Sequence, residues 1–251
     1  MNTQNIQTTT TIYTFENSFI KIIKKLFQKY FFYEEGELCD IHIILNTLSK
    51  NEREDIIRIK NIGFDRNNIF LNDFYHFVDN DPLFFENYKT FIIKYIKPLF
   101  NEEQKILYQT TPNLRISFPN STAIGRTPND DINSNIIGVH KDSDFGHSTE
   151  EVNFIIPITK MFDTNSIYHQ CEIGSREPLE EYSNIILNTD QFLMAKFSQL
   201  YHYNRINTTG KTRLSLDFRV IPFSKYNNSV DNTMSLSAKK KLILGEYFSI
   251  I

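Results

Sequence analysis

The part of the chain that most restricts its fold begins after about residue 105, where short apolar runs alternate with turn-forming residues. Runs of this length, rich in Ile, Phe, Val and Tyr and separated by Gly, Pro, Asn and Asp, are typical of β-strands. Strands are expected over residues 113–118, 136–140, 152–159, 166–173, 184–187, 191–197, 200–203 and 212–221. Eight short strands without intervening helices predict a double-stranded β-helix, the jelly roll that cupin-like proteins share.

The first hundred residues have a different texture, with apolar and aromatic residues at helical spacing. Residues 1–10 are polar and are expected to be flexible. Ser49 and Glu52 form a capping-box pattern, and the last helical stretch is broken near Pro82 and ended at Pro98. Helices are therefore expected over residues 18–32, 40–48, 49–60 and 73–100, with a further one over 235–247.

Together these patterns predict an α+β protein with a single domain over residues 1–251. A mainly helical part (1–105) precedes the β-helix core (106–225) and a C-terminal extension (226–251). The outer face of a major sheet needs an apolar cover, and the aromatic helices are expected to supply it. An alternative use for part of this aromatic surface is a homodimer interface.

Composition narrows the partners of the protein. The net charge of −3 offers no basic surface for nucleic acid, and two cysteines cannot form a disulfide framework. No apolar stretch is long enough to span a membrane, and the polar N-terminus does not resemble a signal peptide. We therefore expect a cytoplasmic protein that binds a small molecule, with neither nucleic acid nor membrane as a partner.

A metal site is predicted by His140 and Asp142, which are two residues apart at the end of an expected strand. Residues i and i+2 of a strand point to the same face, so an imidazole and a carboxylate would lie side by side. His202, in a later strand-like run, would complete a facial triad of two histidines and one carboxylate, the donor set of non-haem iron(II) enzymes. A histidine taken alone is more often a hydrogen-bonded core residue, and only the combination indicates a metal.

A carboxylate site is predicted eleven residues after His202. Arg213 and Ser215 share one face of the last long strand, and an arginine beside a hydroxyl suits a buried carboxylate. With a metal nearby, such a pair fits a dicarboxylate that chelates the metal at its other end. Asn153, an amide in mid-strand, is assigned to the same co-substrate pocket. The alternative for Arg213 is an ion pair with Asp217 on the same strand.

Four segments resemble a known family. They are HKDSDFGH at 140–147, EVNFIIPIT at 151–159, NSIY at 165–168 and HYNRINTTGKTRLSLDFR at 202–219. Over about residues 110–222 the chain resembles streptomycin-biosynthesis-type oxygenases, which are similar to the phytanoyl-CoA dioxygenase branch of the 2-oxoglutarate oxygenases. The resemblance implies a double-stranded β-helix, iron(II), 2-oxoglutarate and O₂. Two positions depart from the family, Tyr203 in place of glycine and Ile155 in place of tryptophan.

The resulting hypothesis is a 2-oxoglutarate-dependent dioxygenase that hydroxylates a small polar metabolite and releases succinate and CO₂. Candidate substrate residues are Arg115, Asp144, His147 and Glu172. A turn-capping role for Asp144 and a surface position for Arg115 are the alternatives. Two other functions remain open: a cupin-like metal enzyme that does not use 2-oxoglutarate, and a binding protein without catalytic activity.

Overall fold

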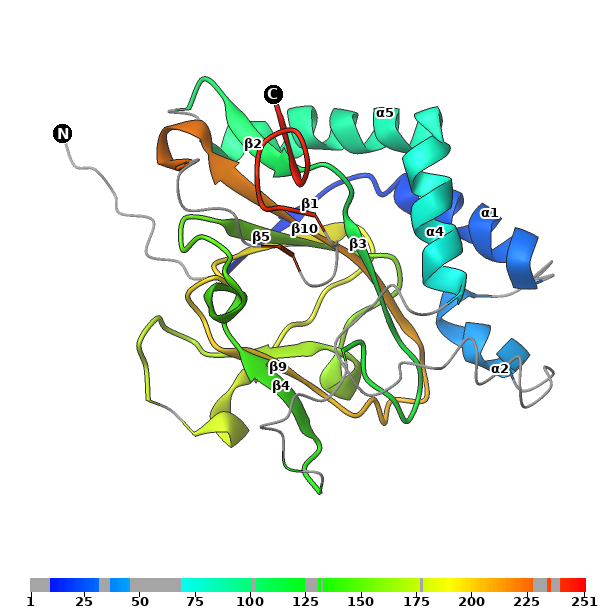
Figure 1. The fold of residues 1–251 in the computed structure, drawn as a ribbon. Coiled ribbons are helices and arrows are strands. Elements are labelled where there is room, and N and C mark those ends of the chain that lie inside the picture. The colour runs from blue at the N-terminus through cyan, green and yellow to red at the C-terminus, as the bar shows by residue number, and fades with distance from the viewer. Residues whose placement is uncertain are drawn as a thin grey trace.

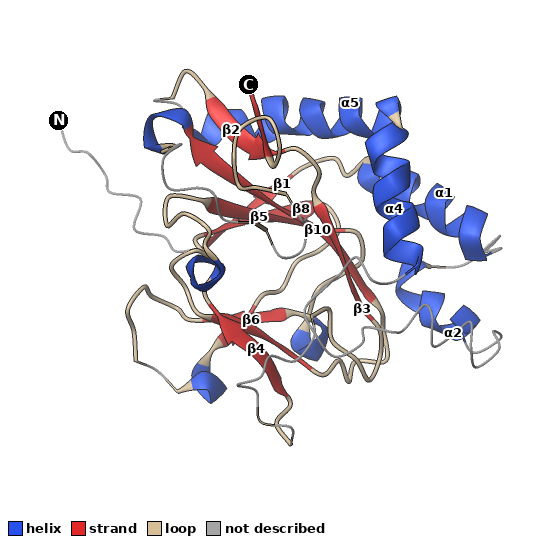
Figure 2. Cartoon of the chain, viewed as in Figure 1, coloured by secondary structure: helices blue, strands red, loops and turns tan. Residues whose placement is uncertain are grey.

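A computed structural model describes the chain over residues 10–31, 37–45, 69–100, 103–124, 131, 133–176, 178–227, 234–235 and 240–251. Its layers are helices, a large sheet and a small sheet, with the helices on one side of the large sheet and the small sheet on the other (Figure 1, Figure 2). All pairings between named strands in these residues are antiparallel. The described fold is therefore mainly antiparallel β-sheet with some helices, as the α+β prediction requires.

The seven-stranded sheet, called here the major sheet, has the order β1-β8-β5-β10-β2-β11, with β3 also paired to β10. The minor sheet has four strands in the order β4-β9-β6-β7. The major-sheet strands are β1 (Thr10–Thr14), β2 (Ile106–Gln109), β3 (Asn113–Ser117), β5 (Val152–Pro157), β8 (Gln191–Ala195), β10 (Arg213–Pro222) and β11 (Phe248–Ile250). The minor-sheet strands are β4 (Ile136–His140), β6 (Ile167–His169), β7 (Ser183–Asn184) and β9 (His202–Arg205).

The helices follow the predicted spacing where they are described. They are α1 (Phe19–Phe31), α2 (Ile41–Leu45), α4 (Ile69–Asn80) and α5 (Pro82–Phe91). Asp81 caps α5, because its carboxylate accepts hydrogen bonds from the backbone N–H groups of Leu83 and Phe84. A π-turn (Ile92–Ile96) and a 3-10 turn (Lys97–Phe100) extend α5 beyond Pro98. The helix predicted over 49–60 lies outside the described residues. Among the helices that are described, none has the length and apolar character of a membrane span.

Each of the eight predicted runs contains residues of a strand, but several bounds differ. Most strands are shorter than predicted, β7 shares only Asn184 with the run 184–187, and β9 lies two residues later than the run 200–203. Three strands were missed. Thr10–Thr14 pairs with β8 although residue 10 was predicted to be flexible, and Ile106–Gln109 and Phe248–Ile250 pair with each other. The predicted helix over 235–247 is wrong for its described part, since residues 240–247 form bridges and turns that lead into β11.

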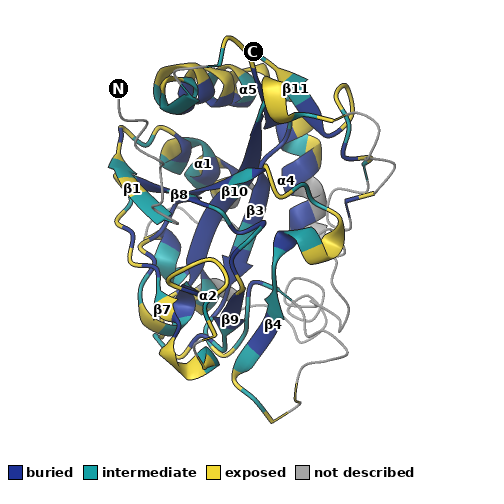
Figure 3. Ribbon diagram, turned by 90° about the vertical axis from the view of Figure 1, so that its left-hand side faces the viewer, coloured by how far each residue is buried: buried dark blue, intermediate teal, exposed yellow. Residues whose placement is uncertain are grey.

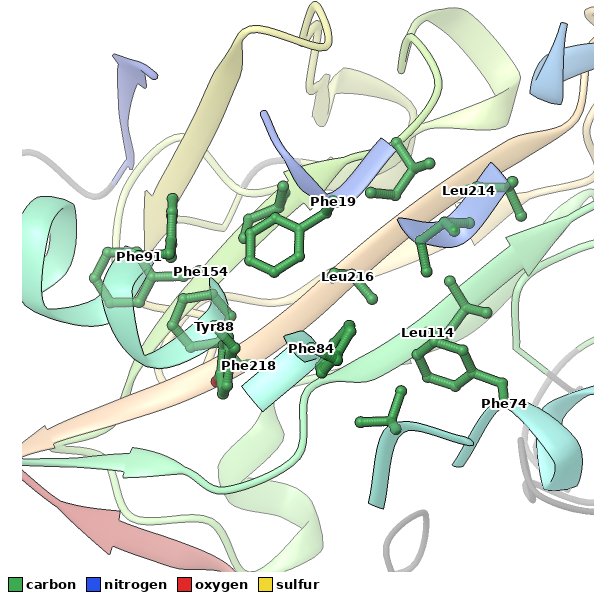
Figure 4. Close-up of a cluster of buried hydrophobic side chains, with 14 of the residues drawn as sticks. Phe19, Phe74, Phe84, Tyr88, Phe91, Leu114, Phe154, Leu214, Leu216 and Phe218 are labelled. Carbon is green, nitrogen blue, oxygen red and sulfur yellow. The ribbon is translucent and has the colours of Figure 1, made fainter. Parts of the chain in front are cut away.

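The two faces of the major sheet differ in chemistry. On one face Phe154, Leu214, Leu216 and Phe218 join a buried core with the helical aromatics, as Figure 4 shows for Phe19, Phe84 and Phe91. Because neighbouring residues of a strand alternate between faces, the residues between these apolar ones face the minor sheet. That second face, called here the inner face, carries Asn113, Arg115, Asn153, Arg213, Ser215, Asp217 and Arg219. Nearly all of β10 is buried (Figure 3).

Candidate metal and co-substrate site

Three potential metal ligands are brought together by the start and end of two paired strands. His140 ends β4, His202 begins β9, and the two residues are directly opposite in the β4–β9 register. The sequence analysis placed Asp142 on the continuation of the strand, but Asp142 instead begins a 3-10 turn (Asp142–Phe145). Its backbone N–H donates to the Phe197 carbonyl at 2.9 Å, which fixes the turn against the chain that leads into β9.

The ligand atoms converge. The Nε2 atoms of His140 and His202 lie 3.6 Å and 3.7 Å from the same carboxylate oxygen, Oδ1 of Asp142. One ligand atom from each residue lies within 4.8 Å of the others, and no other such group of His, Cys, Asp or Glu occurs in the described residues. The separations exceed hydrogen-bond length, so the three groups point to a common position without bonding one another.

Both histidines are held with Nε2 directed at that position. The Nδ1 of His140 lies 2.5 Å from the Gly138 carbonyl, and the Nδ1 of His202 lies 3.1 Å from the Leu200 carbonyl. A carbonyl only accepts, so each Nδ1 carries a proton, and the neutral tautomer that this contact selects has its lone pair on Nε2, where a metal could bind. Burial, and then the neighbouring His140, lower the pKa of His202 to about 3, which keeps this imidazole neutral at physiological pH.

The second oxygen of Asp142 is fully occupied by protein donors. Oδ2 accepts from Asn153 Nδ2 at 2.6 Å and from the Nε and Nη2 of Arg219 at 2.9 Å and 2.8 Å. Burial alone would raise the pKa of Asp142, but Arg219 and His140 outweigh it and hold the pKa well below its usual value. Asp142 is therefore an ionised carboxylate whose free oxygen, Oδ1, faces the two histidines.

Arg219 is itself held by a buried network that the sequence did not reveal. Its Nη1 donates to the Tyr247 hydroxyl at 3.1 Å, and that hydroxyl donates to Gln109 Oε1 at 2.8 Å. Glu151 lies 3.8 Å from Arg219 Nε and accepts from His147 Nδ1 at 2.8 Å. The alternation of β10 could have placed Arg219 on the inner face, but nothing in the sequence pairs it with Asp142 or Tyr247.

This network predicts how substitutions of the residues behind Asp142 change the affinity of the site for a metal. Arg219→Gln is expected to weaken metal binding about 10- to 100-fold, the usual effect of removing a group that orients a ligand. Tyr247→Phe removes one bond farther from Asp142 and is expected to have a smaller effect in the same direction. Calorimetric titration with Co²⁺ would measure both. Wild-type affinity in Arg219→Gln would contradict a role for Arg219 in orienting Asp142.

Arg213 is a buried cation with open donors. Arg213 is the first residue of β10 and is 1% exposed. Its side chain donates one hydrogen bond, from Nη2 to Asn204 Oδ1 at 3.2 Å. Its Nε and Nη1 have no hydrogen-bond partner among the described residues. Burial, and then repulsion from Arg115, lower the pKa of Arg213 to about 10. A buried charge without its counter-charge is costly, so the arrangement indicates an anionic ligand.

The remaining predicted residues fall into different surroundings. Ser215 is buried next to Arg213 on the inner face. Arg115 is not a surface cation, since it lies partly buried with its Nη2 3.3 Å from Asp217 Oδ2; this pair takes the place of the Arg213–Asp217 alternative. Asn153 was predicted to line the co-substrate pocket. Its Nδ2 donates to Asp142, so this part of the amide holds a metal ligand in place and is not open to the co-substrate.

Two of the four substrate candidates lie away from the inner face. Asp144 is exposed and accepts from the backbone N–H of Lys141 at 2.9 Å, the turn-capping role that the sequence left open. Glu172 is exposed in the loop after β6. His147 is nearly buried but contacts Glu151, which places it in the network behind Asp142.

Comparison with known proteins supports the resemblance seen in the sequence. No protein-family model matches the chain. The chain is similar to the streptomycin biosynthesis protein StrG of Streptomyces griseus, with 28% identity over 180 residues, 70% of this chain and 76% of that protein. The predicted resemblance to streptomycin-biosynthesis-type proteins is thus confirmed.

Similar solved structures include EvdO2 from Micromonospora carbonacea var. aurantiaca, with 10% identity, a TM-score of 0.45 and coverage of 86% of this chain and 87% of that one. Apo ThoJ, a non-heme monooxygenase, has 11% identity, a TM-score of 0.44 and coverage of 86% and 75%. HygX from Streptomyces hygroscopicus, with nickel and 2-oxoglutarate bound, has 10% identity, a TM-score of 0.36 and coverage of 86% and 84%.

Proposed function

We propose that this protein is a non-haem iron(II) and 2-oxoglutarate-dependent oxygenase that hydroxylates a small polar metabolite. The observation that carries the proposal is the convergence of His140 Nε2, His202 Nε2 and Asp142 Oδ1, each on a residue whose other polar atom is already bonded. Two neutral imidazoles and one carboxylate are the donor set of an iron(II) site with open positions. The residues present therefore fit this metal.

Arg213 distinguishes 2-oxoglutarate use from the cupin-like alternative. Its two open donors suit the far carboxylate of a dicarboxylate, with Ser215 next to it on β10. An enzyme that used the metal alone would have no need for this buried cation. A binding protein without activity would likewise have no need for the supports behind Asp142. StrG is similar in sequence, and HygX has been solved with 2-oxoglutarate, which agrees with this choice.

Bound iron and 2-oxoglutarate would supply activation of O₂, converting the oxo acid to succinate and CO₂ and one C–H of the substrate to C–OH. The residues of the chain position these reactants. Arg219 and Asn153 keep Asp142 ionised and oriented, and the Gly138 and Leu200 carbonyls orient the histidines. Arg213 and Ser215 would hold the co-substrate so that its oxo acid end reaches the metal. Burial of Asp142, His202, Arg213 and Ser215 limits the access of bulk water to these groups.

The reaction class is tested by supplying the iron-loaded protein with 2-oxoglutarate, ¹⁸O₂ and a metabolite extract, and following masses. We expect one metabolite to gain a single ¹⁸O atom, and we expect no such gain with His202→Ala. A product that forms without oxygen from O₂ would overturn hydroxylation and favour desaturation, ring closure or the cupin-like alternative.

The fold belongs to the same proposal. We propose that the major and minor sheets form a double-stranded β-helix and that residues 1–251 make one cooperative domain. Phe19, Phe74, Phe84 and Phe91 are buried in a core shared with Phe218 of the major sheet, which favours covering over dimerisation for these aromatics.

Removal of the helices should therefore expose the core. A fragment that starts at residue 105 is expected to be insoluble or unable to bind metal, because Phe154, Leu216 and Phe218 would lose their cover. Solubility and Co²⁺ binding of the fragment, next to the full chain, measure this. A soluble fragment that binds Co²⁺ as the full chain does would show that the helices form a separate module.

A further inference from the structure

The residue that precedes Arg213 is bonded to the helical part of the chain. Thr212 is 0% exposed and lies immediately before β10. Its backbone N–H donates to the Cys39 carbonyl at 2.7 Å, and its Oγ1 lies 2.9 Å from His42 Nδ1, within hydrogen-bond distance. Cys39 belongs to a 3-10 turn (Leu38–Asp40) and His42 to α2, which lies at the level of the minor sheet (Figure 1, Figure 3). The start of β10 is therefore bonded to a segment 170 positions earlier in the chain.

Thr159 bonds the residues on both sides of Arg213. Its Oγ1 donates to the Thr212 carbonyl at 3.0 Å and accepts from the Leu214 N–H at 2.8 Å. The N–H, the carbonyl and the hydroxyl of Thr212 thus all have partners, two of them in the helical part and one in the chain after β5. The bonds of Thr212 therefore fix the point at which β10 begins.

Arg213 needs this hold because its surroundings favour its departure from the interior. The guanidinium is buried, donates one hydrogen bond to Asn204, and is repelled by Arg115. A buried charge without a counter-charge costs free energy, which the cation would recover by reaching water. It would reach water if the first residues of β10 separated from the sheet, since residues 206–212 before them form no strand. Such a local opening would withdraw Arg213 from the inner face, and the bonds of Thr212 oppose it.

We propose that His42 is a positioning residue for the co-substrate. Through Thr212 it keeps the Arg213 guanidinium on the inner face, where the cation would bind the far carboxylate of 2-oxoglutarate. This inference deepens the proposed function and rests on it. If only a fraction of the molecules holds Arg213 in place, the apparent affinity for 2-oxoglutarate falls by that fraction, while the metal triad lies on other elements and keeps its affinity. The ion pair of Lys211 with Asp40, 2.7 Å apart, joins the same two segments but is partly exposed and contributes little.

Hydrogen exchange of the full chain, without metal or oxo acid, tests the hold on Arg213 itself. His42→Ala is expected to speed exchange of the Thr212 and Leu214 N–H groups about three- to tenfold, the effect of losing one hydrogen bond. His42→Asn keeps a hydrogen-bonding atom near the position of Nδ1 and should restore slow exchange. In an Arg213→Met background the effect of His42→Ala should be smaller, because no buried cation then favours the opening. Unchanged exchange in His42→Ala, or equal acceleration in both backgrounds, would overturn the inference.

Titration of the Co²⁺-loaded protein with 2-oxoglutarate tests the consequence for binding. We expect His42→Ala to weaken 2-oxoglutarate binding about three- to tenfold with the Co²⁺ affinity unchanged, and His42→Asn to bind as the wild type does. The control is Tyr88→Phe, which removes another hydrogen bond between helix and sheet, from the Tyr88 hydroxyl to the Gln109 carbonyl at 2.9 Å. This variant should keep the wild-type affinity for 2-oxoglutarate.

The outcomes separate this inference from the function on which it rests. Failure of the wild-type protein to bind 2-oxoglutarate would contradict the proposed function and this inference with it. Wild-type binding that His42→Ala does not weaken, or that Tyr88→Phe weakens as much, would contradict this inference alone.

Discussion

His202→Ala is expected to abolish iron binding and activity while leaving the fold largely intact. The imidazole supplies one of three converging ligand atoms, and its neutral state, with the pKa at about 3, is what a metal ligand requires. Metal affinity measured by Co²⁺ titration should fall at least 100-fold, a loss of about 2.7 kcal/mol or more in binding free energy. His140→Ala should behave in the same way.

The matched control for this change is His76→Ala. His76 lies exposed on α4 and is bonded only to Asn80 in the described residues, so its loss should leave metal binding unchanged. Far-ultraviolet circular dichroism should be the same for all three variants, because the strands that carry His140 and His202 have their own apolar neighbours. Full metal occupancy in His140→Ala or His202→Ala would refute the triad.

Arg213→Met is expected to weaken 2-oxoglutarate binding by about 10- to 150-fold, which corresponds to the roughly 1.5–3 kcal/mol of a charge-assisted hydrogen bond. Methionine keeps much of the volume but removes the cation. Because two of the guanidinium nitrogens are unpaired in the free protein, the same change should not lower the Tm and is expected to raise it. The combination of lost affinity and retained stability is specific to a ligand-binding cation.

Titration of the metal-loaded protein with 2-oxoglutarate would measure the affinity. Arg176→Met is the control, since Arg176 is exposed in the loop after β6 and should leave the affinity unchanged. Arg219 also lies on the inner face, but its guanidinium is paired with Asp142. An unchanged 2-oxoglutarate affinity in Arg213→Met would contradict the proposed role of Arg213. The other arginines described on the inner face could not take over this role, because they are paired with carboxylates.

The residues of the candidate site could be selected from the sequence because their order and spacing are local properties. A His-x-Asp pair, a distal histidine and an arginine eleven residues later are visible in one dimension. Strand geometry explains only part of the position of Asp142. The side chain does lie beside His140, but it does so from a turn closed by Gly146, whose φ of 83° is left-handed, and not from a continuing strand.

The hydrogen bonds that hold Asp142 and Arg219 in place could not be predicted, because they join residues far apart in the chain. Arg219 and Asp142 are separated by 77 positions, and Tyr247 and Gln109 by 138. The strand β1 was missed for a related reason. Its sequence, TTIYT, has too few apolar residues to identify a strand, and it is ordered by pairing with β8. Strand β11 has only three residues and depends on β2 in the same way.

The most direct test of the central claim is formation of succinate from 2-oxoglutarate by the purified protein in the presence of a metabolite extract. We expect succinate to form only when iron(II) and O₂ are both present, and to be lost in His202→Ala and strongly reduced in Arg213→Met at low 2-oxoglutarate concentration. If succinate formation is absent in the wild type, or is unaffected by chelation of iron or by His202→Ala, the account of this site as an iron and 2-oxoglutarate centre is contradicted.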